Sequence, residues 1–289
     1  MRPLLSITGA TAGLEACKPM KTRILASVAL LPLLLLVVLA LPKIWTAILF
    51  GLAGALAAYE LLWQTGLVKQ QRLVLYAAVS AFLVSLWSYW GLGRAFGTLL
   101  VLAVFAAYFG EMMASHVKLH FPKVAMCIVA ALVIPYLLTS LVRIHGERLG
   151  KFYIIIPFVM AFMPDSGAYF VGRKFGRHKL APVISPKKTV EGVFGGALSA
   201  IAGMLIYALV LDFGFDMDVN YFYAVIYGIA AAGGSVFGDL CFSVIKRQTG
   251  IKDYGTLIPG HGGILDRFDS MMVVGPLAEA LILLIPLAV

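Results

Sequence analysis

Long apolar runs, separated by short loops that hold most of the charge, constrain this chain more than any other feature. Of its 289 residues, 61% are hydrophobic and 13% are charged, and the mean hydropathy is +0.95. Soluble globular domains have about 45–50% apolar and about 25% charged residues, so this chain has too little charge for a water-facing surface. The runs reach about 20 residues and lack period-two alternation, which predicts membrane-spanning helices rather than a transmembrane barrel.

The apolar segments predict an all-α fold, a polytopic membrane helical bundle with about nine transmembrane helices. We expect spans at roughly 24–41, 43–63, 72–90, 95–113, 124–142, 152–171, 190–211, 221–243 and 269–288. Residues 1–23 form an expected N-terminal tail, in which 1–19 are a candidate leader because Met20 is an alternative start. Residues 24–150 then hold helices 1–5, and residues 151–289 hold helices 6–9 with the motif-rich loops.

The distribution of lysine and arginine predicts the orientation of the bundle. With nine spans, the tail and the loops after spans 2, 4, 6 and 8 share one side, which holds 18 of the 23 basic residues. The positive-inside rule makes this side cytoplasmic, in an inner (cytoplasmic) membrane, together with the N-terminus and the active site. Topology and anionic head groups explain the net charge of +9, so we expect a lipid bilayer and no nucleic acid as partner.

The first candidate site is the polar segment Ser243–Asp269, which combines three kinds of group suited to phosphate chemistry. Its cations can neutralise phosphate oxygens, its glycines let the backbone approach a ligand, and its carboxylates suit Mg²⁺. The cations are Lys246, Arg247, Lys252 and Arg267; the glycines are Gly260, Gly262 and Gly263; the carboxylates are Asp253, Asp266 and Asp269. His261, between the glycines, is a candidate hydrogen-bond donor to phosphate or water. The alternative reading is a solvated loop between two spans.

The second candidate is Asp239, an ionisable residue inside an apolar run, where burial of charge is costly and therefore indicates function. Asp239, Ser243 and Lys246 follow helical spacing and predict one stripe of helix 8. The alternative is a buried aspartate hydrogen-bonded to a neighbouring helix. Glu60, Glu111 and Glu279 also lie in apolar runs, and for these we favour structural pairing.

The third candidate combines Asp165, at the inner half of helix 6, with the basic segment that follows it. Ser185 and Pro186 predict a helix N-cap and first helical residue, which with the two neighbouring lysines makes an anion site. The candidate substrate-binding residues here are Ser185, Lys187, Lys188, Thr189 and Glu191. The alternative is a basic loop that sets topology and binds head groups non-specifically. The sequence contains no zinc-ligand spacing, Walker A motif or nucleophile elbow.

The segment Ser243-x2-Lys-Arg-x4-Lys-Asp-x-Gly-x2-Ile-Pro-x-His-Gly-Gly-x2-Asp-Arg-x-Asp269 resembles the signature of phosphatidate cytidylyltransferases, also called CDP-diacylglycerol synthases. Asp165-Ser-Gly-Ala-Tyr and Ser185-Pro-Lys-Lys-Thr-x-Glu-Gly also resemble that family. The resemblance implies that CTP and phosphatidate give CDP-diacylglycerol and pyrophosphate in phospholipid biosynthesis. It further implies Mg²⁺ on Asp239 and Asp266, a monovalent cation such as K⁺, and a homodimer.

The residues suit such a reaction, because nucleotidyl transfer demands positioning and charge neutralisation more than covalent catalysis. We expect Asp269 and Asp165 to assist the metal ligands, and the cations of Ser243–Asp269 to contact CTP. We expect Lys187 and Lys188 to hold the phosphatidate head group. Three alternatives remain: a CTP-dependent lipid-alcohol kinase, a secondary transporter of an anionic substrate, and a scaffold without catalysis.

Overall fold

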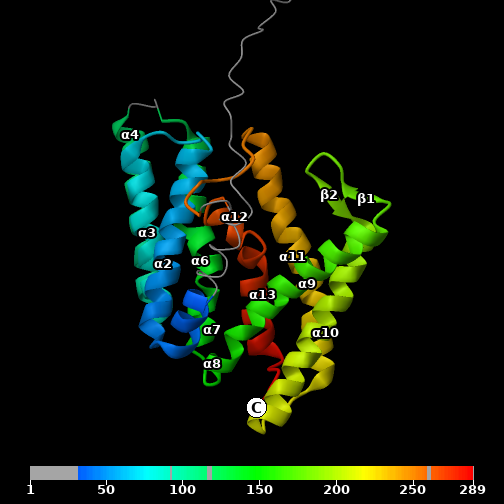
Figure 1. Cartoon of the computed structure of the whole chain (residues 1–289). Coiled ribbons are helices and arrows are strands. Elements are labelled where there is room, and N and C mark those ends of the chain that lie inside the picture. Colours follow the sequence, from blue (N-terminus) through cyan, green and yellow to red (C-terminus); the bar gives the residue numbers. More distant parts are fainter. Residues whose placement is uncertain (1–31, 92, 116–118, 259–261, 289) are drawn as a thin grey trace, which may run out of the picture.

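The computed structural model describes residues 32–91, 93–115, 119–258 and 262–288, and these form a helical bundle (Figure 1). Seven described helical spans are long and apolar enough to cross a membrane. The first span is α2 (Lys43–Tyr59), continued by the π-helix η2 (Glu60–Gln64), and the next two are α3 (Gln71–Trp90) and α4 (Arg94–Ala114). The fourth span is a series of four short helices: α5 (Phe121–Ile128), η3 (Val129–Val133), α6 (Ile134–Leu138) and α7 (Ser140–His145). The last three are α8 (Gly150–Tyr153) together with α9 (Ile155–Phe175), then α10 (Val190–Phe215), then α11 (Tyr221–Gln248). The all-α membrane bundle expected from the sequence is confirmed.

The first and last of the nine expected spans differ from the other seven. Residues 24–31 of the segment 24–41 lie outside the described residues, which begin just before the short π-helix η1 (Leu36–Ala40). The last span is divided into α12 (Leu265–Phe268) and α13 (Met271–Leu284). The 14 residues of α13 extend about 21 Å, which is less than the ~30 Å hydrocarbon core. The last span is therefore shorter than its apolar composition predicts.

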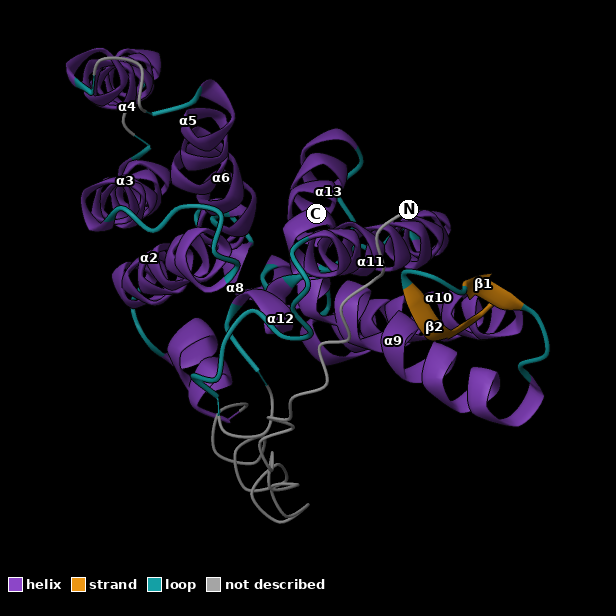
Figure 2. Cartoon of the chain, turned by 90° about the horizontal axis from the view of Figure 1, so that it is seen from above, coloured by secondary structure: helices purple, strands orange, loops and turns teal. Residues whose placement is uncertain are grey.

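Viewed from above, the helices form two groups with α13 between them (Figure 2). One group contains α2 to α7 and the other contains α9, α10 and α11; α13 contacts α6 and α7 in the first and α9 and α11 in the second. Small residues let α9 and α10 pack closely against each other. For example, a Cβ on Gly196 of α10 would lie 2.7 Å from the Pro164 carbonyl oxygen of α9. The arrangement makes α12 and α13 the link between the two halves.

The two ends of the bundle carry different structures. One end has the hairpin of β1 (Lys179–Ala181) and β2 (Ser185–Thr189), and also the loop that leads from α11 to α12 (Figure 1). The opposite end has the α7–α8 turn and the C-terminal segment. There the Tyr153 hydroxyl donates to the Ala288 carbonyl at 2.6 Å, and the Asn220 N–H donates to the Leu287 carbonyl. Both motif-rich loops therefore lie at the same end, as the span count predicts.

Two of the three glutamates in apolar runs have structural partners, as expected. Glu279 of α13 accepts two hydrogen bonds, at 2.6 and 2.7 Å, from the Arg143 guanidinium of α7. Glu111 accepts from the Tyr76 hydroxyl at 3.1 Å. The Arg143–Glu279 pair joins α7 of the first helix group to α13, which lies between the two groups. Its bidentate geometry makes it one of the stronger kinds of ion pair.

The predicted helix start at Ser185 and Pro186 is wrong. These residues belong to β2, which pairs antiparallel with β1, and α10 begins five residues later at Val190. Thr189 caps the helix instead, since its hydroxyl accepts the Gly192 N–H at 3.2 Å. Proline is tolerated in β2 because an edge strand of a two-stranded hairpin does not need every N–H.

Candidate active site

The segment 249–264 is a loop folded back over the end of α11. The buried Tyr254 fixes its middle, because the Tyr254 hydroxyl donates to the Phe242 carbonyl of α11 at 2.9 Å. The Ile258 N–H donates to the Gly262 carbonyl at 3.0 Å. Gly262 has a φ of +88°, a conformation that residues with a Cβ rarely adopt. Residues 259–261, which include the predicted His261, lie outside the described part.

Asp266, at the start of α12, is the centre of the hydrogen bonding in this loop. Its Oδ2 accepts the backbone N–H groups of Tyr254 at 2.6 Å and Gly263 at 3.0 Å. Its Oδ1 lies 2.9 Å from the Lys246 ammonium of α11. The Asp266 side chain is only 2% exposed. The predicted proximity of helix 8 and the start of helix 9 is therefore present, with a buried ion pair joining them.

A third carboxylate, Glu60, reaches the same loop from the N-terminal helices. Glu60 begins η2 and accepts the N–H groups of Ile264 and Leu265, immediately before Asp266. We predicted only structural pairing for Glu60, and a contact with the motif loop was missed. The partner lies 204 residues away in sequence, so no local pattern reveals it.

Asp239 lies on α11 facing the hairpin, and its surroundings differ from those of Asp266. The Ser243 hydroxyl donates to its Oδ1 at 3.2 Å, so these two residues of the predicted stripe lie side by side, whereas Lys246 pairs with Asp266. The Lys188 ammonium of β2 lies 2.5 Å from its Oδ2. That ammonium is buried but has no partner with hydrogen-bond geometry among the described residues. A buried cation without full hydrogen bonding is a strong position for an anionic ligand.

Two more carboxylates accompany Asp239. Asp165 of α9 accepts the Ser235 hydroxyl of α11 at 2.8 Å, and Asp269 follows α12. A Cβ on Gly238 would lie 2.8 Å from the Asp269 carbonyl oxygen, so the glycine lets α11 approach this segment closely. We name Asp165, Asp239 and Asp269 the acidic group.

The hairpin residues that were predicted to bind substrate divide into two kinds. Thr189 and Glu191 have structural partners: Thr189 caps α10, and Glu191 accepts the His178 N–H at 3.2 Å. Lys188 points at the acidic group, whereas its neighbour Lys187 is exposed. Ser185 lies within β2 and is half-buried.

The remaining cations of the motif loop lie further toward the surface. Arg247 donates from Nε to the Ile184 carbonyl at 3.1 Å and so ties the hairpin to α11. Lys252, Asp253 and Arg267 are exposed. The predicted contacts of the cations with CTP, and the predicted suitability of Asp253 for Mg²⁺, stay predictions.

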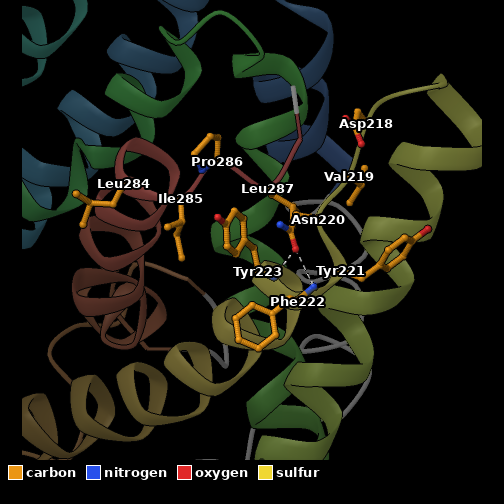
Figure 3. A pocket seen from close by; sticks show the side chains of 10 residues that line it. All are labelled: Asp218, Val219, Asn220, Tyr221, Phe222, Tyr223, Leu284, Ile285, Pro286 and Leu287. Atoms are coloured by element: carbon orange, nitrogen blue, oxygen red, sulfur yellow. Dashed lines mark hydrogen bonds between the residues drawn. The ribbon is translucent and has the colours of Figure 1, made fainter.

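The structure also contains a cavity of about 570 Å³ at the opposite end of the bundle. It lies between the start of α11 and the C-terminal segment 284–287, and Figure 3 shows Asn220 beside it, accepting the N–H groups of Phe222 and Tyr223. None of the predicted site residues lines this cavity. We therefore place the candidate site at the hairpin end.

The fold and the geometry together define a polytopic helical membrane protein with paired acidic and basic side chains at one end of its bundle. Residues 21–285 match the family model described as "Cytidylyltransferase family". The chain belongs to this family, which confirms the resemblance seen in its motifs.

Curated relatives carry a more specific name. The phosphatidate cytidylyltransferase of Staphylococcus epidermidis is 45% identical over 134 residues, which are 46% of this chain and 50% of that protein. The phosphatidate cytidylyltransferase of Haemophilus influenzae is 42% identical over 132 residues, 46% of each chain. That of Staphylococcus aureus is 43% identical over 134 residues. The chain thus aligns with about half the length of the curated relatives that it matches.

Proposed function

We propose that this chain is a phosphatidate cytidylyltransferase that converts CTP and phosphatidate into CDP-diacylglycerol and pyrophosphate. The observation that carries the proposal is the buried Lys188 ammonium beside Asp239, an incompletely bonded cation suited to a phosphate. Family membership supports the cytidylyl donor, and the names of the relatives support phosphatidate as acceptor.

In the proposed reaction, a phosphate oxygen of phosphatidate attacks the α-phosphorus of CTP. The bond between the α-phosphorus and its bridging oxygen to the β-phosphate breaks, and pyrophosphate leaves. Phosphatidate is already anionic at pH 7, so no general base is required. Lys188 is placed to hold the lipid phosphate, and Arg247, Lys252 and Arg267 are candidates for the triphosphate. The protein would act mainly by orienting and neutralising these groups.

The acidic group fits a divalent cation such as Mg²⁺. Carboxylate oxygens are hard ligands, and Mg²⁺ commonly takes one or two carboxylates together with substrate phosphates and waters. Among the described residues no cluster of three or more His, Cys, Asp or Glu side chains is close enough to hold a metal alone. Asp239 with Asp269, and Asp266 with displacement of Lys246, would supply the protein ligands. Such a metal would neutralise the charge that develops on the phosphates.

We also propose that the hairpin end faces the cytoplasm in an inner membrane, and that the protein is a homodimer. The basic residues of the tail and motif loops support the orientation through the positive-inside rule. The dimer, and a monovalent cation such as K⁺ as a further cofactor, rest on the family resemblance.

The test is product analysis with purified protein, phosphatidate micelles and CTP labelled at either the α- or the γ-phosphate. We expect the α-label in the lipid and the γ-label in pyrophosphate, with the rate lost on chelation and restored by Mg²⁺. Lipid that carries the γ-label would identify a lipid kinase and overturn the proposal, as would no transfer of either label. An unchanged rate in chelator would overturn the role of Mg²⁺.

A further inference from the structure

Glu60 is a carboxylate buried to 3% exposure in the half of the protein that carries none of the motif residues. It begins η2, the point where the α-helical spacing of α2 changes to π-helical spacing. Such π-segments are rare and often mark functional positions. Unlike Glu111 and Glu279, it does not take its partners from a side chain on a neighbouring span.

The partners of Glu60 are two backbone N–H groups at the beginning of α12. Its Oε1 accepts from Ile264 at 2.9 Å and its Oε2 accepts from Leu265 at 2.8 Å. α12 has no side-chain cap from its own sequence. Both carboxylate oxygens of a distant span therefore serve as the cap, and charge-assisted bonds of this kind are about twice as strong as neutral ones.

Two loop glycines make room for this contact. A Cβ on Gly263 would lie 2.5 Å from the Glu60 carboxyl carbon and from both carboxylate oxygens. A Cβ on Gly255 would lie 2.7 Å from Oε1. The loop backbone thus lies close to the Glu60 carboxylate, and a side chain at either glycine would have to displace that carboxylate.

A second contact joins α12 to the same span, through α2. The rings of Phe50 in α2 and Phe268 in α12 meet edge to face, with centroids 6.0 Å apart. In sequence, Asp266 lies between Leu265, which donates to Glu60 of η2, and Phe268, which packs on Phe50 of α2. Because Gly263 itself donates to Asp266, the backbone that Glu60 fixes is the backbone that orients the Asp266 carboxylate.

We propose that Glu60 is a positioning residue for the active site, which fixes the Ile264–Leu265 backbone and thereby sets the Asp266 carboxylate. Such a residue gives the N-terminal helices a role in the reaction. Of the tests below, the measurement of enzyme activity rests on the proposed function. The carboxylate acts through the loop and does not touch substrate.

The first test measures amide hydrogen exchange in the purified full chain. In Glu60→Ala, we expect Ile264 and Leu265 to exchange about tenfold faster or more, because each loses its acceptor. The matched control is Glu111→Gln, which removes another carboxylate of the N-terminal helices without touching the loop, and it should leave both amides protected. Wild-type exchange in Glu60→Ala would overturn the proposal, and this result does not depend on any enzyme activity.

The second test is a double-mutant cycle with Gly263→Ala. The added Cβ meets only Glu60 atoms in its closest contacts, so the substitution should cost less in the Glu60→Ala background than in the wild type. Strict additivity of the two effects on exchange would overturn the contact. If Glu60→Ala does not fold, Glu60→Gln takes its place, since the amide keeps one acceptor and should give intermediate exchange.

The activity arm measures the kcat and KM of CTP turnover. We expect Glu60→Ala to lower kcat about 10- to 100-fold, as loss of a supporting shell typically does, with Glu60→Gln between it and the wild type. A fall in amount of folded protein with unchanged kcat would show a merely structural residue and overturn the positioning role. An inactive wild type with fast exchange in Glu60→Ala would instead overturn the proposed function and keep the Glu60 contact.

Discussion

Asp266 and Asp239 are carboxylates at the same end of the bundle, but their surroundings are opposite. Asp266 is 2% exposed and accepts from two backbone N–H groups and one ammonium. Asp239 is 29% exposed, and its neighbours are the Ser243 hydroxyl and the incompletely bonded Lys188 ammonium. The first carboxylate is saturated by the protein, whereas the second has capacity left for a ligand.

This difference separates two tasks that a motif alone does not distinguish. A saturated, buried carboxylate holds a loop in one conformation, because each of its donors would otherwise be buried without a partner. An open carboxylate beside other acidic side chains is costly unless a cation joins it. We therefore propose that Asp266 organises the loop and that the acidic group makes the first contact with cation and substrate.

The largest expected effect comes from Asp239→Asn. The change keeps the shape but removes the charge that a cation requires, so we expect turnover to fall about 10³-fold, within the range for loss of charge stabilisation. The melting temperature should fall less than in Asp266→Asn, because the Asp239 side chain is 29% exposed and that of Asp266 only 2%. Asp212→Asn, at the opposite end of the bundle, is the control. Near-normal turnover in Asp239→Asn would show that the Asp239 charge is not required for the cation, and would contradict the different tasks proposed for Asp239 and Asp266.

Asp266→Asn should reduce both activity and stability. It leaves the Lys246 ammonium buried without its counter-charge, which typically costs about 3–5 kcal/mol of unfolding free energy. We expect about a 10²-fold loss of turnover together with a lower melting temperature. Adding Lys246→Met should recover much of the stability and none of the turnover. A stable but inactive Asp266→Asn would show that Asp266 acts only on the ligand and does not hold the loop.

The adjacent lysines of β2 give a matched pair of intermediate effect. Lys188→Gln removes the buried ammonium that is proposed to hold the lipid phosphate. We therefore expect the KM for phosphatidate to rise about tenfold, which corresponds to about 1.4 kcal/mol for the loss of one ionic hydrogen bond. Lys187→Gln, at the exposed neighbour, should change KM by about twofold or less. Equal effects of the two substitutions would indicate a non-specific basic loop.

The smallest effect on turnover is expected from the ion pair between α7 and α13. Glu279→Gln weakens the bidentate contact with Arg143 and should lower the melting temperature, at a cost of about 2–3 kcal/mol for a hydrogen bond to a charged group. It should leave kcat unchanged, because the pair lies outside the site. A large fall in kcat at full stability would extend the site to this pair.

The sequence predicts the features that depend on local composition. Apolar runs of about 20 residues locate seven spans because every backbone group in lipid must bond within its own helix. The stripe from Asp239 to Ser243 follows from helical spacing. The hairpin at Ser185 was missed because proline after serine also suits a helix start, and strand pairing decided the outcome.

Contacts between distant segments stay hidden in a single sequence. Nothing near Glu60 indicates that its partners are Ile264 and Leu265, and nothing near Lys188 indicates Asp239. The sequence predicts that Gly263 lets the backbone approach a ligand, whereas in the structure Gly263 and Gly255 lie against the Glu60 carboxylate. Such pairings depend on which helices pack together, and composition does not fix this.

The most direct test measures transfer of the α-phosphate label from CTP to phosphatidate by reconstituted wild-type protein and Asp239→Asn. We expect labelled CDP-diacylglycerol from the wild type and about a thousandth of that rate from the variant, with both proteins folded at the assay temperature. Wild-type transfer by Asp239→Asn, or no α-label in the lipid with the wild type, would contradict this expectation.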